Sequence, residues 1–268
     1  MQEIESNKHA WSQLSADHYQ TFKRSLQQGT HQLNRYIRQE LGDLSGKHVI
    51  HLQCNTGADT LTLAGMCAEA TGVDLVPDNI KYARQLAQDL QISNARFIEA
   101  DIMQLAELHH ETYDVVFVSE GAIGWLPDLK CWGRTIGQLL KDDGFVYVFD
   151  SHPFFLAFDE QKLPAGQLEI KYPYFGREPD VDDSIGGYAS EPKHGVKAYF
   201  WMYTVADVIN ALLEAGLALD YFHEFEESYF DAGGMQPVAG QLHNYDYNQG
   251  LFPMSFSVRA HPALPAHG

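Results

Sequence analysis

The sequence predicts an α/β protein with one seven-stranded, mostly parallel sheet and helices on both of its faces. Between residues 48 and 149, short apolar runs alternate with longer stretches in which apolar residues recur at helical spacing. Two of the short runs, 113–118 and 145–149, are almost continuously apolar, which is typical of parallel strands covered by helices on both faces. A helical stretch and two more strand-like runs follow near the end of the chain. This alternation favours a doubly wound sheet.

The first 45 residues are expected to form a helical cover that precedes the sheet. Apolar residues recur at helical spacing from residue 8 to residue 42, and Gly29 and Thr30 divide this stretch into two helices. Such a cover can have two roles. It can pack on a face of the sheet, or it can form a flap over a bound ligand with Trp11 and Tyr19 turned inward.

The sheet is expected to begin near residue 48. The first helix after it should start at Ala58 or Asp59, where Asp59 and Thr60 can accept hydrogen bonds from its free N–H groups. Pro77 opens the next helix, because the first turn of a helix does not use the N–H that proline lacks. The remaining elements of this half are strands at 70–75, 95–99, 113–118 and 145–149, a helix at 129–140 and a turn at 142–144.

Residues 151–198 interrupt this rhythm and are expected to form a lid. The segment lacks a clear period and holds five prolines and many aromatic residues. Long segments of this kind inside a compact domain are usually functional. The sequence predicts one or two strands near 168–172 and places the most mobile part at 178–191. A second loop, 227–250, should lie over the same end of the sheet.

The periodic pattern returns after the lid. Thr204 is expected to cap a helix that runs to Glu214 and is terminated by Gly216. Strands at 218–226 and 254–260 then complete the sheet. We expect the whole chain, 1–268, to form a single domain.

The balance of charge is strongly acidic. The chain has 18 basic and 36 acidic residues and a formal net charge of −18. Such a chain has no electrostatic reason to bind nucleic acid or an anionic membrane surface. Solubility alone can account for the charge. A sharper interpretation is that the charge repels polyanionic substrates.

Cysteine usage and the N-terminal pattern indicate a reducing compartment. The three cysteines, Cys54, Cys67 and Cys131, are odd in number and widely spaced, which argues against a disulfide framework or a zinc site. The first residues lack the basic-then-apolar pattern of a signal peptide, and no apolar run approaches the length of a membrane span. We therefore expect a cytoplasmic protein that binds no membrane and no metal.

The stretch 49–74 carries the clearest functional signal. It reads as a strand, a short polar loop, a helix, a second strand and an acid, Asp74. The free N–H groups at the start of such a helix attract an anion. An acid that ends the second strand can accept hydrogen bonds from both hydroxyls of a ribose. A nucleoside-containing cofactor fits this arrangement.

Five segments together resemble the class I S-adenosylmethionine-dependent methyltransferase family, and the resemblance covers nearly the whole chain. HLQCNTGADT lies at the family's glycine-rich loop, and TGVDLVPDNIKYAR lies at its second strand. FIEADIMQL corresponds to its adenine-contacting segment. YDVVFVSEGAIGWLPDL and LLKDDGFVYVFDSHP correspond to its fourth and fifth strands. The resemblance implies a Rossmann-like sheet whose last strand is antiparallel. It also implies S-adenosyl-L-methionine as cofactor and S-adenosyl-L-homocysteine as product. The cofactor-binding residues that it implies are Trp11, Tyr19, Gln53, Cys54, Asn55, Gly57, Thr60, Asp74, Leu75, Asn79, Asp101, Ile102 and Ser119.

Two glycines of the family's first loop are replaced in this chain. Gln53 and Asn55 occupy those positions, Gly57 is kept, and His51 replaces the usual acid of the first strand. Asparagine tolerates left-handed backbone better than most residues, so Asn55 is a credible substitute. Gln53 adds a side chain beside the methionine part of the cofactor. The replacements bear on individual contacts more than on the class of cofactor.

The resemblance implies methyl transfer in which the protein mainly positions a nucleophile in line with the S–CH3 bond. Glu120 and His152 follow strands four and five, where open α/β sheets bind ligands, and are candidates for a catalytic base. Each also has a structural interpretation, in which it shapes a local turn. We expect a small-molecule acceptor, because aromatic side chains of the two long loops can exclude water and the acidic charge disfavours a polyphosphate.

Two other classes of function stay open at this stage. A NAD-type oxidoreductase of Rossmann fold would also use a strand, a turn, a helix and an acid, although it normally needs a fuller G-x-G-x-x-G loop. A non-catalytic S-adenosylmethionine-binding regulatory protein would be consistent with the altered glycine loop. The sequence does not decide between a monomer and a homodimer, and it does not identify the methyl acceptor.

Overall fold

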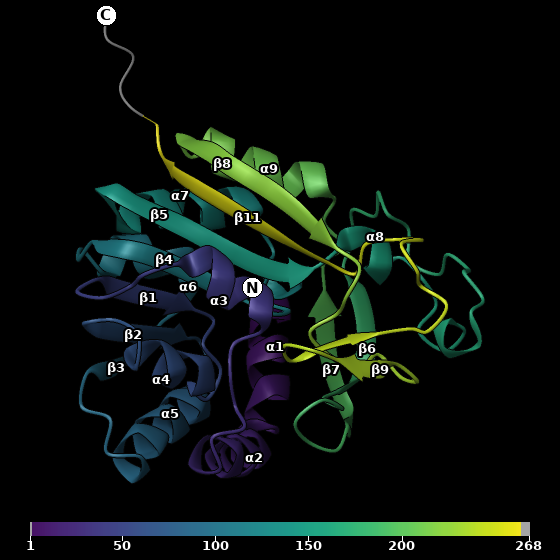
Figure 1. Ribbon diagram of the computed structural model, residues 1–268, viewed down its shortest axis with the longest axis horizontal. Coiled ribbons are helices and arrows are strands. Elements are labelled where there is room, and N and C mark those ends of the chain that lie inside the picture. The colour runs from purple at the N-terminus through teal and green to yellow at the C-terminus, as the bar shows by residue number, and fades with distance from the viewer. Residues whose placement is uncertain (1, 264–268) are drawn as a thin grey trace, which may run out of the picture.

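Seven strands form the central sheet of the computed structural model, which describes residues 2–263 (Figure 1). They are β1 (His48–Leu52), β2 (Glu69–Asp74), β3 (Ala95–Glu99), β4 (Tyr113–Ser119), β5 (Leu140–Ser151), β8 (Leu217–Phe225) and β11 (Ser255–Pro262). Their spatial order is β3-β2-β1-β4-β5-β11-β8. β1 to β5 are parallel, and β11 runs antiparallel to both β5 and β8. The predicted mostly parallel sheet with an antiparallel last strand is confirmed.

Helices cover both faces of the sheet. One face carries α6 (Ile102–Leu108), α7 (Leu129–Leu139) and α9 (Val205–Glu214), and the other carries α3 (Arg35–Leu41), α4 (Ala58–Ala64) and α5 (Pro77–Asp89). In β5, Val146 and Val148 pack in the core under α6, α7 and α9. Tyr147 and Phe149 pack in the core on the opposite face of the sheet. This alternation follows from the two-residue period of a strand.

The N-terminal cover consists of three helices instead of the predicted two. α1 (Gln2–Ser12) begins earlier than expected, and a turn at Gln13 and Leu14 separates it from α2 (Ser15–Gln27). The third is α3. The prediction missed this break because Trp11, Leu14 and His18 keep helical spacing across it. Within residues 2–263, no helix has both the length and the apolar character that crossing a membrane requires.

The insertion after β5 contains a β-hairpin where the sequence predicted the most mobile part of the lid. A short helix, α8 (Pro153–Leu156), comes first, and β6 (Asp180–Ile185) and β7 (Lys193–Phe200) then pair antiparallel. The predicted strand near 168–172 is wrong, since the described chain has only one isolated bridge there, between Phe158 and Ile170. The hairpin has a weak local signal because most residues of β6 are polar and exposed.

Helix α1 stabilises this hairpin by binding the free edge of β7. The side-chain amide of Asn7 donates to the Tyr199 carbonyl at 2.8 Å and accepts from the Tyr199 N–H at 2.7 Å. The Ser6 hydroxyl donates to the Lys197 carbonyl at 2.8 Å. Figure 1 shows α1 directly beside β7. Two segments about 190 residues apart therefore form one cover, and side-chain contacts satisfy an edge that would otherwise expose unpaired backbone groups.

The second long loop packs against the first half of the insertion. It holds a small hairpin of β9 (Gln236–Val238) and β10 (Leu242–Asn244). An apolar cluster joins it to the insertion and consists of Phe155, Phe158, Leu163, Met235, Tyr245, Phe252 and Met254. Both loops therefore lie beyond the end of β5, as Figure 1 shows.

The close packing of α7 on α9 gives a testable prediction about stability. A Cβ atom added at Gly133 would lie 2.3 Å from the backbone oxygen of Ala211, so Gly133→Ala must push α9 away from α7. We expect it to lower the free energy of unfolding by about 1–3 kcal/mol, the usual cost of overpacking.

Gly137→Ala, one turn further along α7, is the matched control. Its added Cβ would lie 3.2 Å from the Ala215 oxygen, a smaller misfit. The gain in helix propensity, about 1 kcal/mol, should offset that misfit. Urea unfolding of both variants measures the difference, and equal stabilities would contradict the described packing.

Candidate active site

A cavity of about 470 Å³ lies at the carboxyl ends of β1, β2, β4 and β5. Its polar wall comes from the loops that follow these strands. Its aromatic wall comes mainly from the N-terminal helices, the insertion and the second loop, and consists of Trp11, Phe22, Trp125, Tyr188, Phe200, Tyr229 and Phe230. Open α/β sheets bind ligands at this edge.

The loop after β1 adopts the backbone conformation that glycines usually provide. Gln53 and Asn55 have positive φ angles of 56° and 51°, and Gly57 has a φ of 82°. The Asn55 side chain accepts from the Thr56 N–H at 2.6 Å, a local contact that favours this conformation in asparagine. The Gln53 amide nitrogen donates to the Ala122 carbonyl at 2.7 Å. Each replacement of a glycine thus brings a hydrogen bond that compensates for backbone strain.

Asp74, at the end of β2, holds this loop in place. Its carboxylate accepts from the N–H of Asn55 at 2.8 Å, the N–H of Val76 at 2.9 Å and the side-chain amide of Asn79 at 3.1 Å. Burial outweighs these contacts and raises the pKa of Asp74 to about 6. The same carboxylate lines the cavity, so it is available to a ligand with hydroxyl groups.

Asp101 and Ile102 form the wall of the cavity beyond β3. The Asp101 carboxylate caps α6 by accepting from the Met103 N–H at 2.9 Å. Of the predicted cofactor-binding residues, ten line this cavity: Trp11, Gln53, Cys54, Asn55, Asp74, Leu75, Asn79, Asp101, Ile102 and Ser119. The structure therefore brings together residues that the chain spreads over more than a hundred positions.

Three predicted residues lie behind the cavity wall. Gly57 is needed for packing, because a Cβ there would lie 2.6 Å from the ring of Phe97. Thr60 bonds His51. Tyr19 faces away, with its ring stacked on Tyr82 and its hydroxyl donating to Asp89. Tyr19 thus joins α2 to α5 and does not form part of a flap.

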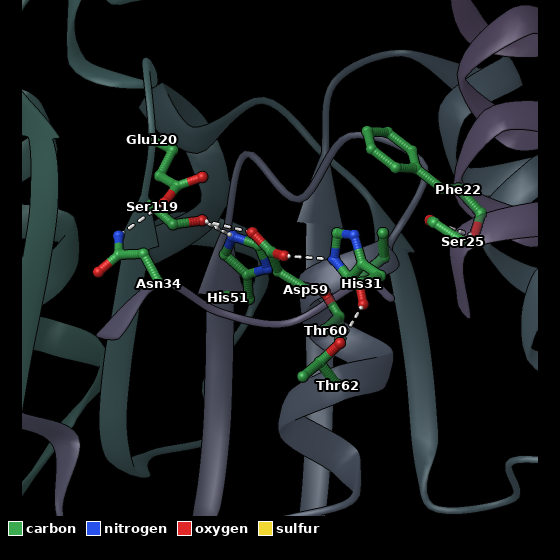
Figure 2. A network of polar contacts seen from close by, with 11 residues as sticks. Phe22, Ser25, His31, Asn34, His51, Asp59, Thr60, Thr62, Ser119 and Glu120 are labelled. Carbon is green, nitrogen blue, oxygen red and sulfur yellow. Dashed lines mark hydrogen bonds and ion pairs between the residues drawn. The ribbon is translucent and has the colours of Figure 1, made fainter. Parts of the chain in front are cut away.

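A polar network runs from the N-terminal cover to β4 (Figure 2). Asp59 accepts from Ser119 at 3.2 Å and pairs with His31 at 2.8 Å. His51 lies 3.1 Å from the Ser119 hydroxyl and 2.9 Å from that of Thr60. Burial lowers the pKa of His51 to about 4, so its ring is neutral.

This network corrects the predicted role of Asp59 and Thr60 at the start of α4. Gly57 precedes α4, and no side chain caps the helix. Asp59 and Thr60 bond side chains of the cover and the sheet instead. Their partner His31 had no local signal, because it lies in a loop far away in the sequence. Only the tertiary structure brings it to the cavity.

Glu120 points into the cavity from the loop that follows β4. It has a φ of 39°, unusual for a residue other than glycine. Asp150, near the end of β5, fixes this loop. Its carboxylate accepts from the N–H groups of Gly121, Ala122 and Ile123 at 2.8–3.0 Å. Asn34 donates to the Glu120 carboxylate at 2.8 Å. Burial first, and then the charges of Asp59 and Asp150, raise the pKa of Glu120 to about 8.

His152, the other candidate base, has a structural role. Its Nδ1 accepts from the Phe154 N–H at 3.1 Å and caps α8, while its Nε2 lies 2.9 Å from a carboxylate oxygen of Glu224. Both ring nitrogens have partners outside the cavity, and the side chain does not line it. The structure gives His152 a capping and ion-pairing role and does not support the hypothesis that it is a catalytic base, because the side chain does not line the cavity.

Residues from both long loops complete the cavity beside Glu120. The Ser151 hydroxyl donates to the Tyr229 hydroxyl at 3.0 Å, and Phe230 and Leu156 line the same region. Tyr188 of the insertion reaches the other side, where the Asn55 amide donates to its hydroxyl at 3.3 Å. The sequence indicated that both loops face this edge, but it gave no sign of which aromatic residues reach the cavity.

Comparisons with known proteins point to one family. Residues 43–172 match the model of a methyltransferase domain family. A ubiquinone biosynthesis O-methyltransferase of Acinetobacter baylyi is 26% identical over 44% of this chain and 50% of its own length. A 23S rRNA (uracil(1939)-C(5))-methyltransferase of Shewanella frigidimarina is 38% identical over 47% of this chain and 27% of its own length. The chain thus spans about half or less of the length of these curated relatives.

The fold has close counterparts among solved structures. A structure described as a DhpI-SAM-HEP complex superposes with a TM-score of 0.58 at 15% identity and covers 97% of this chain and 98% of its own. An S-adenosylmethionine-dependent methyltransferase from Mesorhizobium loti superposes with a TM-score of 0.54 at 20% identity and covers 84% and 95%. Residues 43–172 thus have the sequence pattern of a methyltransferase domain, and the chain has the fold of solved S-adenosylmethionine-dependent methyltransferases.

Proposed function

We propose that this protein transfers the methyl group of S-adenosylmethionine to a small-molecule acceptor. One observation carries the proposal. A single cavity joins the loop after β1, Asp74 and Asp101 to a second group of residues that includes Glu120, Ser151 and Tyr229. The first group suits the cofactor, and the second suits an acceptor beside it.

The residues of the first group fit the chemistry of the cofactor. Asp74 would accept hydrogen bonds from the ribose hydroxyls, as strand-end acids of such sheets do. Asp101 would accept from the adenine amine while the N–H of Ile102 faces a ring nitrogen. The oxygen of the Gln53 side chain has no partner among the described residues and would serve the methionine part. Trp11 and Trp125, whose rings lie 5.1 Å apart, offer aromatic faces that stabilise a sulfonium.

The chemistry that the cofactor supplies is an activated methyl group, so the protein needs to orient the acceptor and exclude water. Glu120 is the candidate for holding the acceptor's nucleophilic atom and taking its proton. Its carboxylate lies in the cavity, and a base is most effective when its pKa is near the working pH. In-line SN2 displacement then depends on positioning by the walls of the cavity.

The insertion is proposed to act as a lid over this cavity. Tyr188 contacts Asn55 in the loop after β1, which we call the cofactor loop, and the Thr21 hydroxyl donates to the Ala189 carbonyl at 2.9 Å. The hairpin is attached to α1 along β7, so the cover can move as one unit. Closure would exclude water from the methyl group.

A nucleic-acid acceptor is the second candidate, because one group of relatives is named for 23S rRNA. This chain spans only about a quarter of those relatives. A net charge of −18 opposes binding of a polyanion, and the only lysine or arginine among the cavity-lining residues of the described chain is Lys8. These observations favour a small molecule.

The activity itself is tested with methyl-labelled cofactor. Purified protein should form S-adenosylhomocysteine when a small-metabolite extract is added, and one metabolite should gain the mass of a methyl group. Total RNA, added in a parallel assay, should gain no label. A thermal shift with S-adenosylhomocysteine and none with NAD would separate this function from that of an oxidoreductase. Cofactor binding without any methylated product would instead favour a non-catalytic, regulatory role.

The raised pKa of Asp74 predicts how cofactor binding depends on pH. Hydroxyl donors favour the ionised carboxylate, so binding must remove a proton from Asp74 below pH 6. Affinity for S-adenosylhomocysteine should therefore fall as pH falls, by about tenfold between pH 7 and pH 5. Calorimetry across this range measures the effect.

Asp74→Asn is the control for this pH effect. It should bind the same ligand more weakly at pH 7 and show little change between pH 7 and pH 5, because the titrating group is gone. Glu120, with a pKa of about 8, stays mostly protonated across this window and should not contribute. A wild-type affinity that does not vary with pH would remove Asp74 from the ribose site.

The lid proposal predicts a change in hydrogen exchange. Backbone amides of 180–200 should exchange more slowly when S-adenosylhomocysteine is bound, because closure holds the hairpin against the cofactor loop. Tyr188→Ala should reduce this protection and weaken ligand binding by up to about tenfold, the worth of roughly one hydrogen bond. Tyr172→Ala, in the same insertion and away from the cavity lining, should do neither. Unchanged exchange upon binding would show that the insertion is not a lid.

A further inference from the structure

The acceptor end of the cavity has an uneven balance of charge. Glu120, Asp59 and Asp150 lie close enough for the charges of the two aspartates to raise the pKa of the glutamate. Lys8 is the only lysine or arginine that lines the cavity within the described residues, and it lies on α1, in the cover. His51 is neutral. A ligand with positive charge would relieve this repulsion, whereas an anion would add to it.

The Glu120 carboxylate lacks a complete set of donors. The described residues provide it with one side-chain donor, Asn34, for its two oxygens. Buried acceptors without donors are costly. A ligand that donates several hydrogen bonds would therefore be stabilised here.

The aromatic residues provide an independent argument for the same kind of ligand. Tyr229 and Phe230 line the cavity from the second loop, and Trp125 lines it from the loop after β4. The faces of such rings attract a cation and do not attract an anion. Carboxylate oxygens and aromatic faces together are the groups that bind ammonium ions.

We propose that the methyl acceptor is an amine that binds as its ammonium ion, with Glu120 as the group that receives its proton. This inference rests on the proposed function and adds the chemical class of the acceptor. The ammonium gives one proton to the Glu120 carboxylate, and the freed nitrogen lone pair forms the new N–CH3 bond. The C–S bond breaks at the same time, and its electron pair stays on sulfur. The product is a methylated ammonium, and Glu120 then returns its proton to water.

The environment of Glu120 makes proton release a measurable signature of this binding mode. The titratable groups that face it are Asp59 with its partners His31 and His51, Asp150, Tyr188 and Tyr229. Because Glu120 is mostly protonated in the free protein at pH 7, an arriving ammonium must displace that proton. A neutral alcohol of the same shape has no charge to displace it.

The test compares three probes of matched shape on the complex with S-adenosylhomocysteine. They are phenethylamine, phenethyl alcohol and hydrocinnamate, which carry an ammonium, a hydroxyl and a carboxylate. Calorimetry at pH 7 should rank the amine above the alcohol by about tenfold or more, the range for hydrogen bonds to a charged group. The carboxylate should bind most weakly. Repeating the titration in buffers of different ionisation enthalpy should show that only the amine releases a proton.

Glu120→Gln tests the assigned residue, and Glu226→Gln is the matched control. Glu226 is exposed directly after β8 and does not line the cavity, so its substitution makes the same change in net charge elsewhere. Glu120→Gln should bring the affinities for amine and alcohol to within about threefold and abolish proton release, since the charge-assisted hydrogen bond is gone. Its affinity for S-adenosylhomocysteine should stay within about threefold of the wild type, which shows that the site is folded. Glu226→Gln should behave as the wild type does.

The outcomes separate this inference from the proposed function. If S-adenosylhomocysteine does not bind the wild type, the proposed function itself fails. If it binds and the amine binds no better than the carboxylate, or if none of the three probes binds, the amine acceptor is wrong while the cofactor site stands. An amine preference that survives Glu120→Gln would overturn the role of Glu120.

Discussion

The site depends on buried carboxylates that hold neighbouring loops by their backbone N–H groups. Asp74 at the end of β2 accepts from the loop that follows β1, and Asp150 at the end of β5 accepts from the loop that follows β4. Each acid lies one strand away from the loop that it fixes. A buried carboxylate or backbone N–H group without a partner would be costly. The hydrogen bonds between each carboxylate and the N–H groups of its loop stabilise the left-handed backbone found in both loops.

This arrangement explains how the chain tolerates replacements in a loop that usually holds glycines. The backbone keeps its left-handed conformation at Gln53 and Asn55 because Asp74, Ala122 and Thr56 provide hydrogen bonds at fixed positions. The side chains then add polar atoms to the cavity that glycines could not. The loop thus keeps its shape and acquires a different surface toward the ligand.

The sequence was sufficient to predict the central fold and many of the residues that line the cavity. The positions of Asp74, at the end of β2, and Asp101, two residues after β3, follow directly from the order of strands, because parallel strands end at one edge. It was insufficient for contacts that depend on tertiary structure. His31 reaches Asp59 only after the cover packs, and Glu120 receives Asn34 from the N-cap of α3. The role of His152 also required the structure, since its partner Glu224 lies on an edge strand far along the chain. The mostly polar hairpin of β6 and β7 gave a weak pattern because its stability comes from α1.

The bond between Asn7 and Tyr199 has a consequence for how the protein is made. The two residues are 192 positions apart. At a synthesis rate of about 5–20 residues per second, α1 leaves the ribosome roughly 10–40 s before the strand that it binds. During that interval β1 to β5 can already form, with the loop after β1 and Asp74 in place. The nascent chain would then pass through a stage in which the strand-end wall of the cavity exists but the hairpin of its cover does not, and Leu14 lacks its contacts with Ile185 and Ala198.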